Sequence, residues 1–172
     1  LERLLLTGTA AVGGTGNDAA NLITGNAAAN TLNGGGGNDT LSGGLGNDTL
    51  LGGAGADLLS GGGGADFFRF ARASEGSDTI ADFDPAADFV QVSASGFGGG
   101  LVAGMNLAAT GRFIANTSGV ANAPAGRGQF VYETDVGQLW WDSDGTGAGA
   151  RVSIATFTGL PAVTAADLIV LA

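Results

Sequence analysis

The sequence of 172 residues contains no cysteine, no histidine and no lysine. Without cysteine, the chain forms no disulfide. The absence of histidine and lysine excludes a catalytic triad of the usual kind, a zinc site with histidine or cysteine ligands and a Walker lysine. Carboxylates are present, but their nine-residue regularity favours metal ligation over the paired acids of a glycosidase. We therefore expect no enzyme activity in this chain, and any catalytic domain would lie upstream of it.

Long apolar runs and basic residues are also scarce. No run reaches the 18 apolar residues that a transmembrane helix needs, and no N-terminal signal peptide is recognisable. Six basic residues stand against sixteen acidic ones, and the net charge of −10 disfavours binding to nucleic acid or to anionic membranes. Because the chain begins at Leu1 instead of methionine, we expect a fragment of a longer protein.

Glycine, in contrast, is abundant, with 34 residues, and much of it is periodic. Residues 34–69 divide into four nonapeptides, GGGGNDTLS, GGLGNDTLL, GGAGADLLS and GGGGADFFR. Each fits G-G-x-G-x-D-x-U-x, where U is a large apolar residue. A fixed short period indicates one structural unit stacked on itself, and this unit predicts a calcium-binding parallel β-helix. A flexible glycine-rich linker is the alternative, but a linker would not keep an acid and an apolar residue in register.

The residue types explain the chemistry of the repeat. Glycines allow tight turns with positive φ, and the x-U-x triplet forms a short strand whose U side chain points inward. Two nonapeptides close one coil, so Asp57 is expected to stack on Asp39, and Asp66 on Asp48, at about the 4.8 Å spacing of neighbouring strands. Carboxylate and carbonyl oxygens around such a gap suit Ca²⁺, which takes roughly 6–8 oxygen ligands. Stacked carboxylates repel one another without a cation, so we expect the fold to depend on calcium.

These repeats resemble the RTX (repeats-in-toxin) β-roll of bacterial proteins that are exported by type I secretion. The resemblance implies two calcium sites, in which positions 1, 3 and 6 of one unit meet positions 2, 4 and 6 of the unit two later. It places the carbonyls of Gly34, Gly36, Gly53 and Gly55 with Asp39 and Asp57 in the first site. It places the carbonyls of Gly43, Leu45, Gly62 and Gly64 with Asp48 and Asp66 in the second.

The nine-residue frame continues backwards in two weaker repeats. In GNDAANLIT and GNAAANTLN, residues 16–33, Asn21 and Asn30 replace the aspartate, while Ile23 and Leu32 keep the apolar position. A neutral asparagine offers an oxygen but no charge. We therefore expect Asn21 and Asn30 to form weak calcium sites with the next aspartates or to act as a cap, after a first strand and a degenerate coil in residues 1–15.

The glycine pattern ends at Phe70, and an acidic segment follows. Residues 75–94 resemble the D-x-I-x-D-F element that follows the roll in serralysin-type domains, and the segment 78–88 holds four aspartates. An eighteen-residue spacing puts Glu75 after Asp57 and Asp84 after Asp66, so either acid could close the last metal gap. A solvated acidic turn is the alternative.

The rest of the chain predicts a β-sheet that caps the roll. Strands are expected at 129–133, 138–142 and 151–157, which form a meander, with a further strand at 89–93 and a loop excursion in 96–128. The predicted fold is therefore all-β, a parallel β-roll in residues 1–74 followed by a small antiparallel β-sandwich or capping sheet in residues 75–172. Trp140 and Trp141 face opposite sides of one strand, so one is expected in the core and the other covering an edge or stacking on a sugar.

Two further segments carry alternatives. The loop DSDGTGAG at 142–149 has part of a calcium loop, with Asp142 and Asp144 as candidate ligands, but an Asx turn explains it equally. Residues 164–172, with Asp167 before an apolar run, resemble the C-terminal secretion signal of serralysin-type proteins, and they also suit a final strand.

The favoured hypothesis is a calcium-binding, calcium-induced folding and secretion module at the C-terminus of a larger secreted bacterial protein. Its implied partners are calcium ions and the type I secretion machinery, and its implied location is extracellular, in the medium or at the cell surface. The alternative is a carbohydrate-binding, matrix-binding, surface-layer or adhesin module of the same fold, with a glycan or a second copy of itself as partner.

Overall fold

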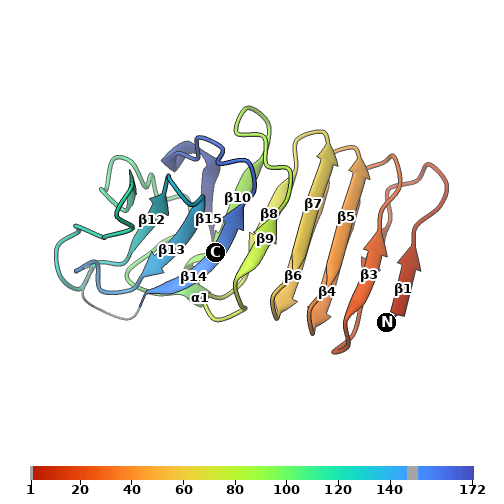
Figure 1. The fold of residues 1–172 in the computed structure, drawn as a ribbon, viewed down its shortest axis with the longest axis horizontal. Helices are drawn as coiled ribbons and strands as arrows, with labels where there is room; N and C mark the ends of the chain where they lie inside the picture. The colour runs from red at the N-terminus through yellow and green to blue at the C-terminus, as the bar shows by residue number, and fades with distance from the viewer. Residues whose placement is uncertain (1, 147–150) are drawn as a thin grey trace.

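A computed structural model describes residues 2–146 and 151–172 (Figure 1). The described chain is almost entirely β-structure, with one four-residue helix, α1 (Ala94–Phe97), and one 3-10 turn (Ala165–Asp167). The predicted all-β class is therefore confirmed. Neither helix is long or apolar enough to cross a membrane.

Fifteen strands form two sheets that face each other along the roll (Figure 1). The nine-stranded sheet has the spatial order β1 (Glu2–Leu5), β3 (Asn21–Thr24), β5 (Thr40–Leu45), β7 (Leu58–Gly63), β9 (Asp78–Ile80), β14 (Val152–Phe157), β13 (Gln138–Asp142), β12 (Gln129–Glu133) and β11 (Phe113–Asn116). The six-stranded sheet has the order β15 (Leu168–Leu171), β10 (Phe89–Ser93), β8 (Phe67–Phe70), β6 (Thr49–Ala54), β4 (Thr31–Gly36) and β2 (Gly13–Thr15). From β1 to β10, successive strands alternate between the sheets, so two strands make one coil.

The apolar eighth positions of the repeats build the core of the roll. Within the nine-stranded sheet Ile23 pairs with Leu41 and Leu41 with Leu59, and in the other sheet Leu32 pairs with Leu50 and Leu50 with Phe68. All six side chains are at most 1% exposed and belong to one hydrophobic cluster between the sheets. The inward direction predicted for the U side chain is therefore confirmed.

The coils continue past the end of the glycine pattern. Strand β9 pairs with β7 so that Ile80 lies beside Leu59, and β10 pairs with β8 so that Val90 lies beside Phe68. These partners are 21 and 22 residues apart in sequence instead of 18, so three and four extra residues loop out before the chain returns to the sheets.

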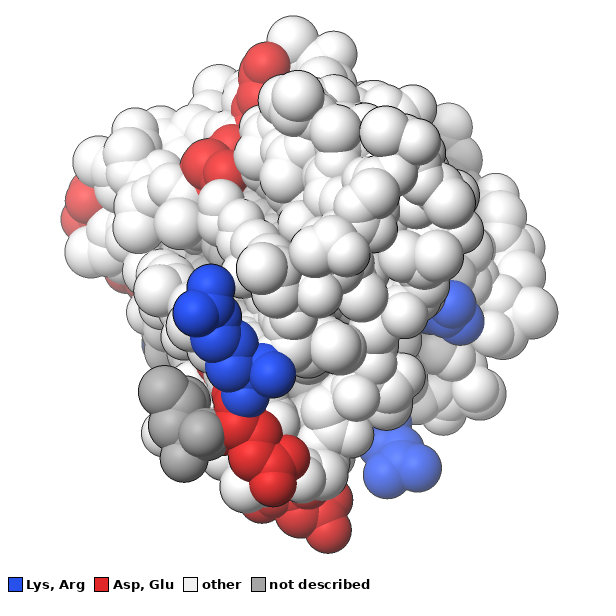
Figure 2. Space-filling model, turned by 90° about the vertical axis from the view of Figure 1, so that its right-hand side faces the viewer, with Lys and Arg blue, Asp and Glu red and all other residues white. Residues whose placement is uncertain are grey.

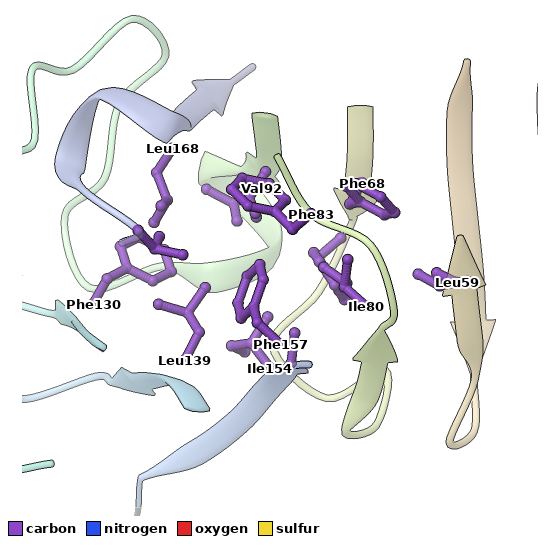
Figure 3. Close-up of a cluster of buried hydrophobic side chains, with 14 of the residues drawn as sticks. Leu59, Phe68, Ile80, Phe83, Val92, Phe130, Leu139, Ile154, Phe157 and Leu168 are labelled. Carbon is purple, nitrogen blue, oxygen red and sulfur yellow. The ribbon is translucent and has the colours of Figure 1, made fainter. Parts of the chain in front are cut away.

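The C-terminal meander extends the roll directly. Strands β12 and β13 have the predicted bounds and pair antiparallel with each other, and β14 pairs antiparallel with β13 and parallel with β9. On the opposite sheet, β15 pairs with β10. The core therefore passes without a break from Leu59 and Phe68 to Phe157 and Phe130 (Figure 3). Both sheets contain strands from before and after residue 75. The division of the chain into two domains at this residue stays a prediction.

The two tryptophans divide as the sequence predicts. Trp141 is 1% exposed and packs on Phe130, with their ring centroids 4.6 Å apart. Trp140 is half-buried, and the guanidinium of Arg151 lies over its ring at 4.9 Å. Its indole N–H donates to a carboxylate oxygen of Glu133 at 3.2 Å, so this side chain covers the outer face of the meander.

The end of the roll formed by β1 presents few charges to solvent. Figure 2 looks onto this end, and most of its surface is uncharged, with acidic and basic groups scattered over it. The acidic residues of the repeats contribute little to any surface, because Asp39, Asp48, Asp57 and Asp66 are at most 2% exposed. Much of the negative charge of the chain is therefore held inside the fold.

Candidate metal centre

Two ladders of carboxylates run along the roll, one on each edge. On the first edge, the main-chain N–H of Asn21 donates to Oδ1 of Asp39 at 2.7 Å, and the N–H of Asp39 donates to Oδ1 of Asp57 at 2.7 Å. On the second edge, the N–H of Asn30 donates to Oδ1 of Asp48 at 2.7 Å, and the N–H of Asp48 donates to Oδ1 of Asp66 at 2.8 Å. The predicted stacking of Asp57 on Asp39 and of Asp66 on Asp48 is thus confirmed.

The second carboxylate oxygens have no such partner. Within the described residues, Oδ2 is buried and accepts no hydrogen bond in four side chains: Asp39, Asp48, Asp57 and Asp66. A buried polar atom without a partner costs about 1–3 kcal/mol, and more when it is charged. These four oxygens therefore lack an interaction that a cation would supply.

A carbonyl oxygen of the next coil approaches two of these oxygens, those of Asp39 and Asp48. A Cβ atom added to Gly34 would lie closer than 3.0 Å to Oδ2 of Asp39 and 2.6 Å from the carbonyl oxygen of Gly52. Gly43 has the same surroundings, with Oδ2 of Asp48 and the carbonyl oxygen of Gly61, 2.5 Å from the added atom. Carboxylate and carbonyl oxygens thus converge at the first glycine of the repeat, and they are the hard ligands that calcium prefers.

Some of the converging oxygens were absent from the predicted ligand set. The carbonyls of Gly52 and Gly61 belong to the first position of the unit two repeats later, whereas the sequence prediction used the second and fourth positions of that unit. The nine-residue spacing of these glycines can be read from the sequence. The direction in which their carbonyls point cannot, because it depends on the dihedral angles of the stacked turns.

The predicted glycine ligands lie in tightly stacked turns. Gly35 pairs with Gly53 and Gly36 with Ala54, in register between neighbouring coils. Gly53 and Gly55 have φ of 97° and 146°, and a Cβ on either would collide with a carbonyl of the coil below. Glycine is therefore required there for two reasons, conformation and close approach. Direct calcium ligation by the predicted carbonyls stays a prediction.

The two asparagines of the early repeats are satisfied without metal. The Asn21 amide donates to the Ala19 carbonyl and, at 3.1 Å, to Oδ1 of Asp39. For Asn30, Oδ1 accepts the N–H of Asn26 at 2.8 Å, and Nδ2 donates to the Val12 carbonyl at 3.0 Å. Neither amide carries a buried oxygen without a partner.

The predicted place of Asp84 in the ladder is wrong. Asp88 follows Asp66, accepting its N–H on Oδ1 at 2.9 Å, because four inserted residues shift the register. Asp84 is exposed, and its Oδ1 accepts the N–H of Ala86 within the turn that contains the insertion. Its role as a metal ligand is untested, but it does not stack on Asp66.

The register after Asp57 is shifted in the same way. Asp78 occupies the ladder position, with Oδ1 accepting the N–H of Asp57 at 3.1 Å. Glu75 lies in the preceding turn, where its carbonyl accepts the N–H of Gly55 at 2.7 Å. Asp78 and Asp88 belong to the predicted acidic segment 78–88, but the eighteen-residue spacing does not assign them to the ladders.

Burial and crowding shape the electrostatics of the ladders. Burial raises the pKa of Asp66 to about 6 and that of Asp78 to about 7, and neighbouring carboxylates add to both shifts. Burial also raises the pKa of Asp48 and Asp57. Within the described ranges, no three acidic side chains converge on one point, so most ligands of a cation here would be main-chain carbonyls.

The loop after β13 has the geometry of an Asx turn. Oδ1 of Asp142 accepts the N–H groups of Asp144 at 3.1 Å and Gly145 at 2.8 Å. The remainder of the predicted partial calcium loop, residues 147–149, lies outside the described residues. Calcium binding by this loop stays untested.

A parallel β-roll with buried carboxylate ladders and converging carbonyl oxygens defines a calcium-binding repeat domain. The RTX calcium-binding nonapeptide repeat family matches residues 12–50, 33–68 and 42–80. The chain belongs to the RTX calcium-binding repeat family, and the nonapeptide repeats of that family bind calcium. The sequence-based family assignment, the roll and the calcium cofactor are thereby confirmed.

Two solved structures resemble most of the chain. One is the AlgE6R3 subunit of the mannuronan C5-epimerase from Azotobacter vinelandii, with 31% identity, a TM-score of 0.54 and coverage of 88% of this chain and 78% of that one. The AlgE6R2 subunit of the same enzyme shows 30% identity, a TM-score of 0.52 and coverage of 90% and 89%. No curated protein sequence matches the chain.

Proposed function

We propose that this module folds when calcium binds between its coils, and that it serves as the calcium-dependent folding and secretion module of a larger secreted bacterial protein. The observation that carries the proposal is the set of four buried carboxylate oxygens without a hydrogen-bond partner in the described residues. A buried, unpaired carboxylate destabilises a fold, and a bound cation supplies the missing interaction. Because the unfolded chain has no such site, calcium binding and folding are linked by mass action.

Circular dichroism of the purified chain tests the folding step. We expect little β-structure in a chelator and a β-rich spectrum after titration with calcium chloride. Magnesium chloride at the same concentration is the control, because Mg²⁺ demands a smaller octahedral site and keeps its water. An identical β-rich spectrum in chelator and in calcium contradicts the proposal.

The affinity range connects folding with export. Extracellular modules bind calcium with Kd of about 10⁻⁴–10⁻³ M. At the much lower free calcium inside a cell, the carboxylate ladders keep the chain unfolded and able to pass through a type I secretion channel. Calcium outside the cell then folds the roll. The proposal assigns no catalysis to the module itself.

A second candidate function is binding of a carbohydrate by the folded module. Both similar structures are subunits of an epimerase of mannuronan, and the outer face of the six-stranded sheet carries an aromatic pair. Phe67 and Phe89 are half-buried and stack with ring centroids 5.7 Å apart, and the exposed Arg69 follows two residues after Phe67 on the same face. Calorimetry with mannuronan in calcium tests this function, with Phe67→Ala as the variant that should lose binding.

A further inference from the structure

Strand β11 forms an open edge of the nine-stranded sheet. It is the last strand in the spatial order, and among the described strands it pairs with β12 alone. Its neighbour β12 lies at the end of the molecule opposite the N-terminus (Figure 1). The edge therefore belongs to the C-terminal meander and not to the calcium-binding coils.

The main-chain groups that face outward on this edge are those of Phe113 and Ala115. The carbonyls of Arg112 and Asn116 accept N–H groups from the side of β12, at 2.7 and 2.9 Å. Successive residues of a strand direct their N–H and C=O groups to opposite edges, so Phe113 and Ala115 face away from β12. Within residues 2–146 and 151–172, these two N–H groups and two carbonyls have no hydrogen-bond partner.

The usual protections of an edge strand are missing from β11. Charged side chains, proline and bulges keep natural edge strands from pairing with other chains. Strand β11 reads FIAN, without charge or proline, and its register with β12 is continuous. Ala115 is exposed, and Val120, whose carbonyl accepts the Asn116 amide at 3.0 Å, is 46% exposed beside the end of the strand. This edge is therefore suited to pairing with a further strand.

The sequence around β11 lacks charge, although the chain is strongly acidic. In residues 89–126 the only charged residue is Arg112. Its side chain is 7% exposed, and its guanidinium donates to the carbonyls of Gly99 and Gly128 at 2.6 and 2.9 Å. Two copies of a chain with net charge −10 repel each other, so contact between them costs least through an uncharged surface.

We propose that two copies of the folded chain associate through β11, as an antiparallel pair about a twofold axis. The edge is self-complementary: with Ile114 of the two copies opposite each other, Phe113 of each copy lies opposite Ala115 of the other. Each of these pairs exchanges two N–H···O=C bonds. The proposal goes beyond calcium-driven folding, since it concerns what the folded chain binds.

The register with β12 shows which side chains meet in this dimer. Ile114 is half-buried and stands beside Val131, which is fully buried. The two copies of Ile114 therefore meet at the axis and extend the apolar row that Val131 begins. The two nine-stranded sheets join into one continuous sheet.

Sedimentation velocity of the full chain in calcium chloride tests the association. Interfaces below about 1,200 Å² are typically weak, so the titration covers about 1 µM to about 1 mM of chain. Ala115→Pro removes an outward N–H and leaves the bonds to β12 in place, so it should raise the dissociation constant by about tenfold or more. Ala115→Ser keeps that N–H and should stay within about twofold of the wild-type chain. Circular dichroism in calcium checks that both variants fold.

A cysteine at the twofold axis provides an independent test, because the chain contains no cysteine. In Ile114→Cys, the two thiols stand in a non-hydrogen-bonded pair, with Cα atoms about 4.5 Å apart, which a disulfide can span. Mild oxidation in calcium should therefore give a covalent dimer. Ala27→Cys places a single thiol at an exposed residue of the roll and should stay monomeric under the same oxidation.

The outcomes separate the dimer from the proposed function. A β-rich chain that stays monomeric in calcium at the highest concentration overturns the dimer and leaves calcium-driven folding intact. Equal dissociation constants for Ala115→Pro and Ala115→Ser also overturn it, as do species that grow beyond the dimer with concentration. If Ala115→Pro fails to fold, the cross-linking decides, because equal yields of covalent dimer from Ile114→Cys and Ala27→Cys contradict pairing at β11.

Discussion

The main-chain N–H of Asp39 donates to Oδ1 of Asp57 at 2.7 Å, although eighteen residues separate the two in sequence. This contact holds one oxygen of Asp57 on the preceding coil and leaves the other, Oδ2, buried without a partner. Each of the four repeat aspartates, Asp39, Asp48, Asp57 and Asp66, therefore has one oxygen that accepts a hydrogen bond from the preceding coil and one that is available to calcium. The stability of the roll and its affinity for calcium consequently depend on the same side chains.

Asp57→Asn should raise the calcium concentration at the folding midpoint by about tenfold or more. The substitution removes a charge from the gaps on both sides of Asp57, and a tenfold change corresponds to about 1.4 kcal/mol. Calcium titrations followed by circular dichroism measure the midpoint. Asp135→Asn, in the exposed turn between β12 and β13, is the matched control and should shift it less than twofold. Equal shifts in the two variants would contradict the ladder.

Gly34→Ala should also raise the calcium requirement by about tenfold. Its Cβ would collide with Oδ2 of Asp39 and with the carbonyl of Gly52, the two oxygens that converge there. Gly63→Ala is the control, because its Cβ meets only the flexible end of Leu45, at 3.2 Å, and an alanine already stands at the equivalent Ala54. Similar calcium midpoints for both alanine variants would show that the converging oxygens do not bind calcium.

Without calcium, the residual stability of the fold should fall as pH rises from about 4 to about 7. Folding raises the pKa of Asp78 from 3.8 to about 7 and that of Asp66 to about 6, so the folded state favours the protonated carboxyls. Ionisation therefore destabilises the fold across this window, and the loss is complete above the folded-state pKa. The β-structure content in calcium-free buffer, followed by circular dichroism between about pH 4 and about pH 7, measures the trend, and Asp78→Asn should weaken it. A stability that rises with pH between 4 and 7 would refute this assignment.

With calcium present, the pH dependence should reverse in sign. The unfolded chain takes up protons on its carboxylates near their ordinary pKa of about 4, whereas carboxylates that hold calcium stay ionised, so the calcium midpoint should rise as pH falls from about 6 to about 4. Calcium-induced folding at about pH 4.5 should accordingly release protons, which calorimetry in buffers of different ionisation enthalpy detects. Folding without proton release at that pH would contradict direct binding of calcium by the carboxylates.

Deletion of residues 167–172 should abolish export by a type I secretion host and leave calcium binding by the roll in place. In the folded chain this segment forms β15, and Asp167 accepts the N–H and the hydroxyl of Thr164 at 2.7 and 2.9 Å. Among the described strands, β15 pairs with β10 alone, at the edge of the six-stranded sheet and away from the turns that carry the ladders. Secretion assays and calcium titrations of the truncated chain measure the two effects separately. Normal export of the truncated chain would show that β15 is a structural strand and that the signal lies elsewhere.

Local periodicity made much of the roll predictable. Each nonapeptide repeats the same glycine turn, aspartate and inward apolar residue, so the pairing of Leu41 with Leu59 follows from counting eighteen residues. Strand β13 was predictable for a similar reason, because its first four residues alternate between half-buried and buried, whereas four consecutive residues of β12 are buried. These features depend on interactions between near neighbours in sequence or between identical units.

The sequence by itself therefore determined the roll, the ladder through Asp66 and the preference for calcium. Only the tertiary structure decided that Asp78 and Asp88, and not Glu75 and Asp84, continue the ladders. Counting along the chain cannot show how many residues loop out between strands, because a surface loop absorbs three or four residues at little cost in free energy. The register after Phe70 is set instead by hydrogen bonds and core packing between coils, which bring Ile80 and Val90 into line with the residues before them.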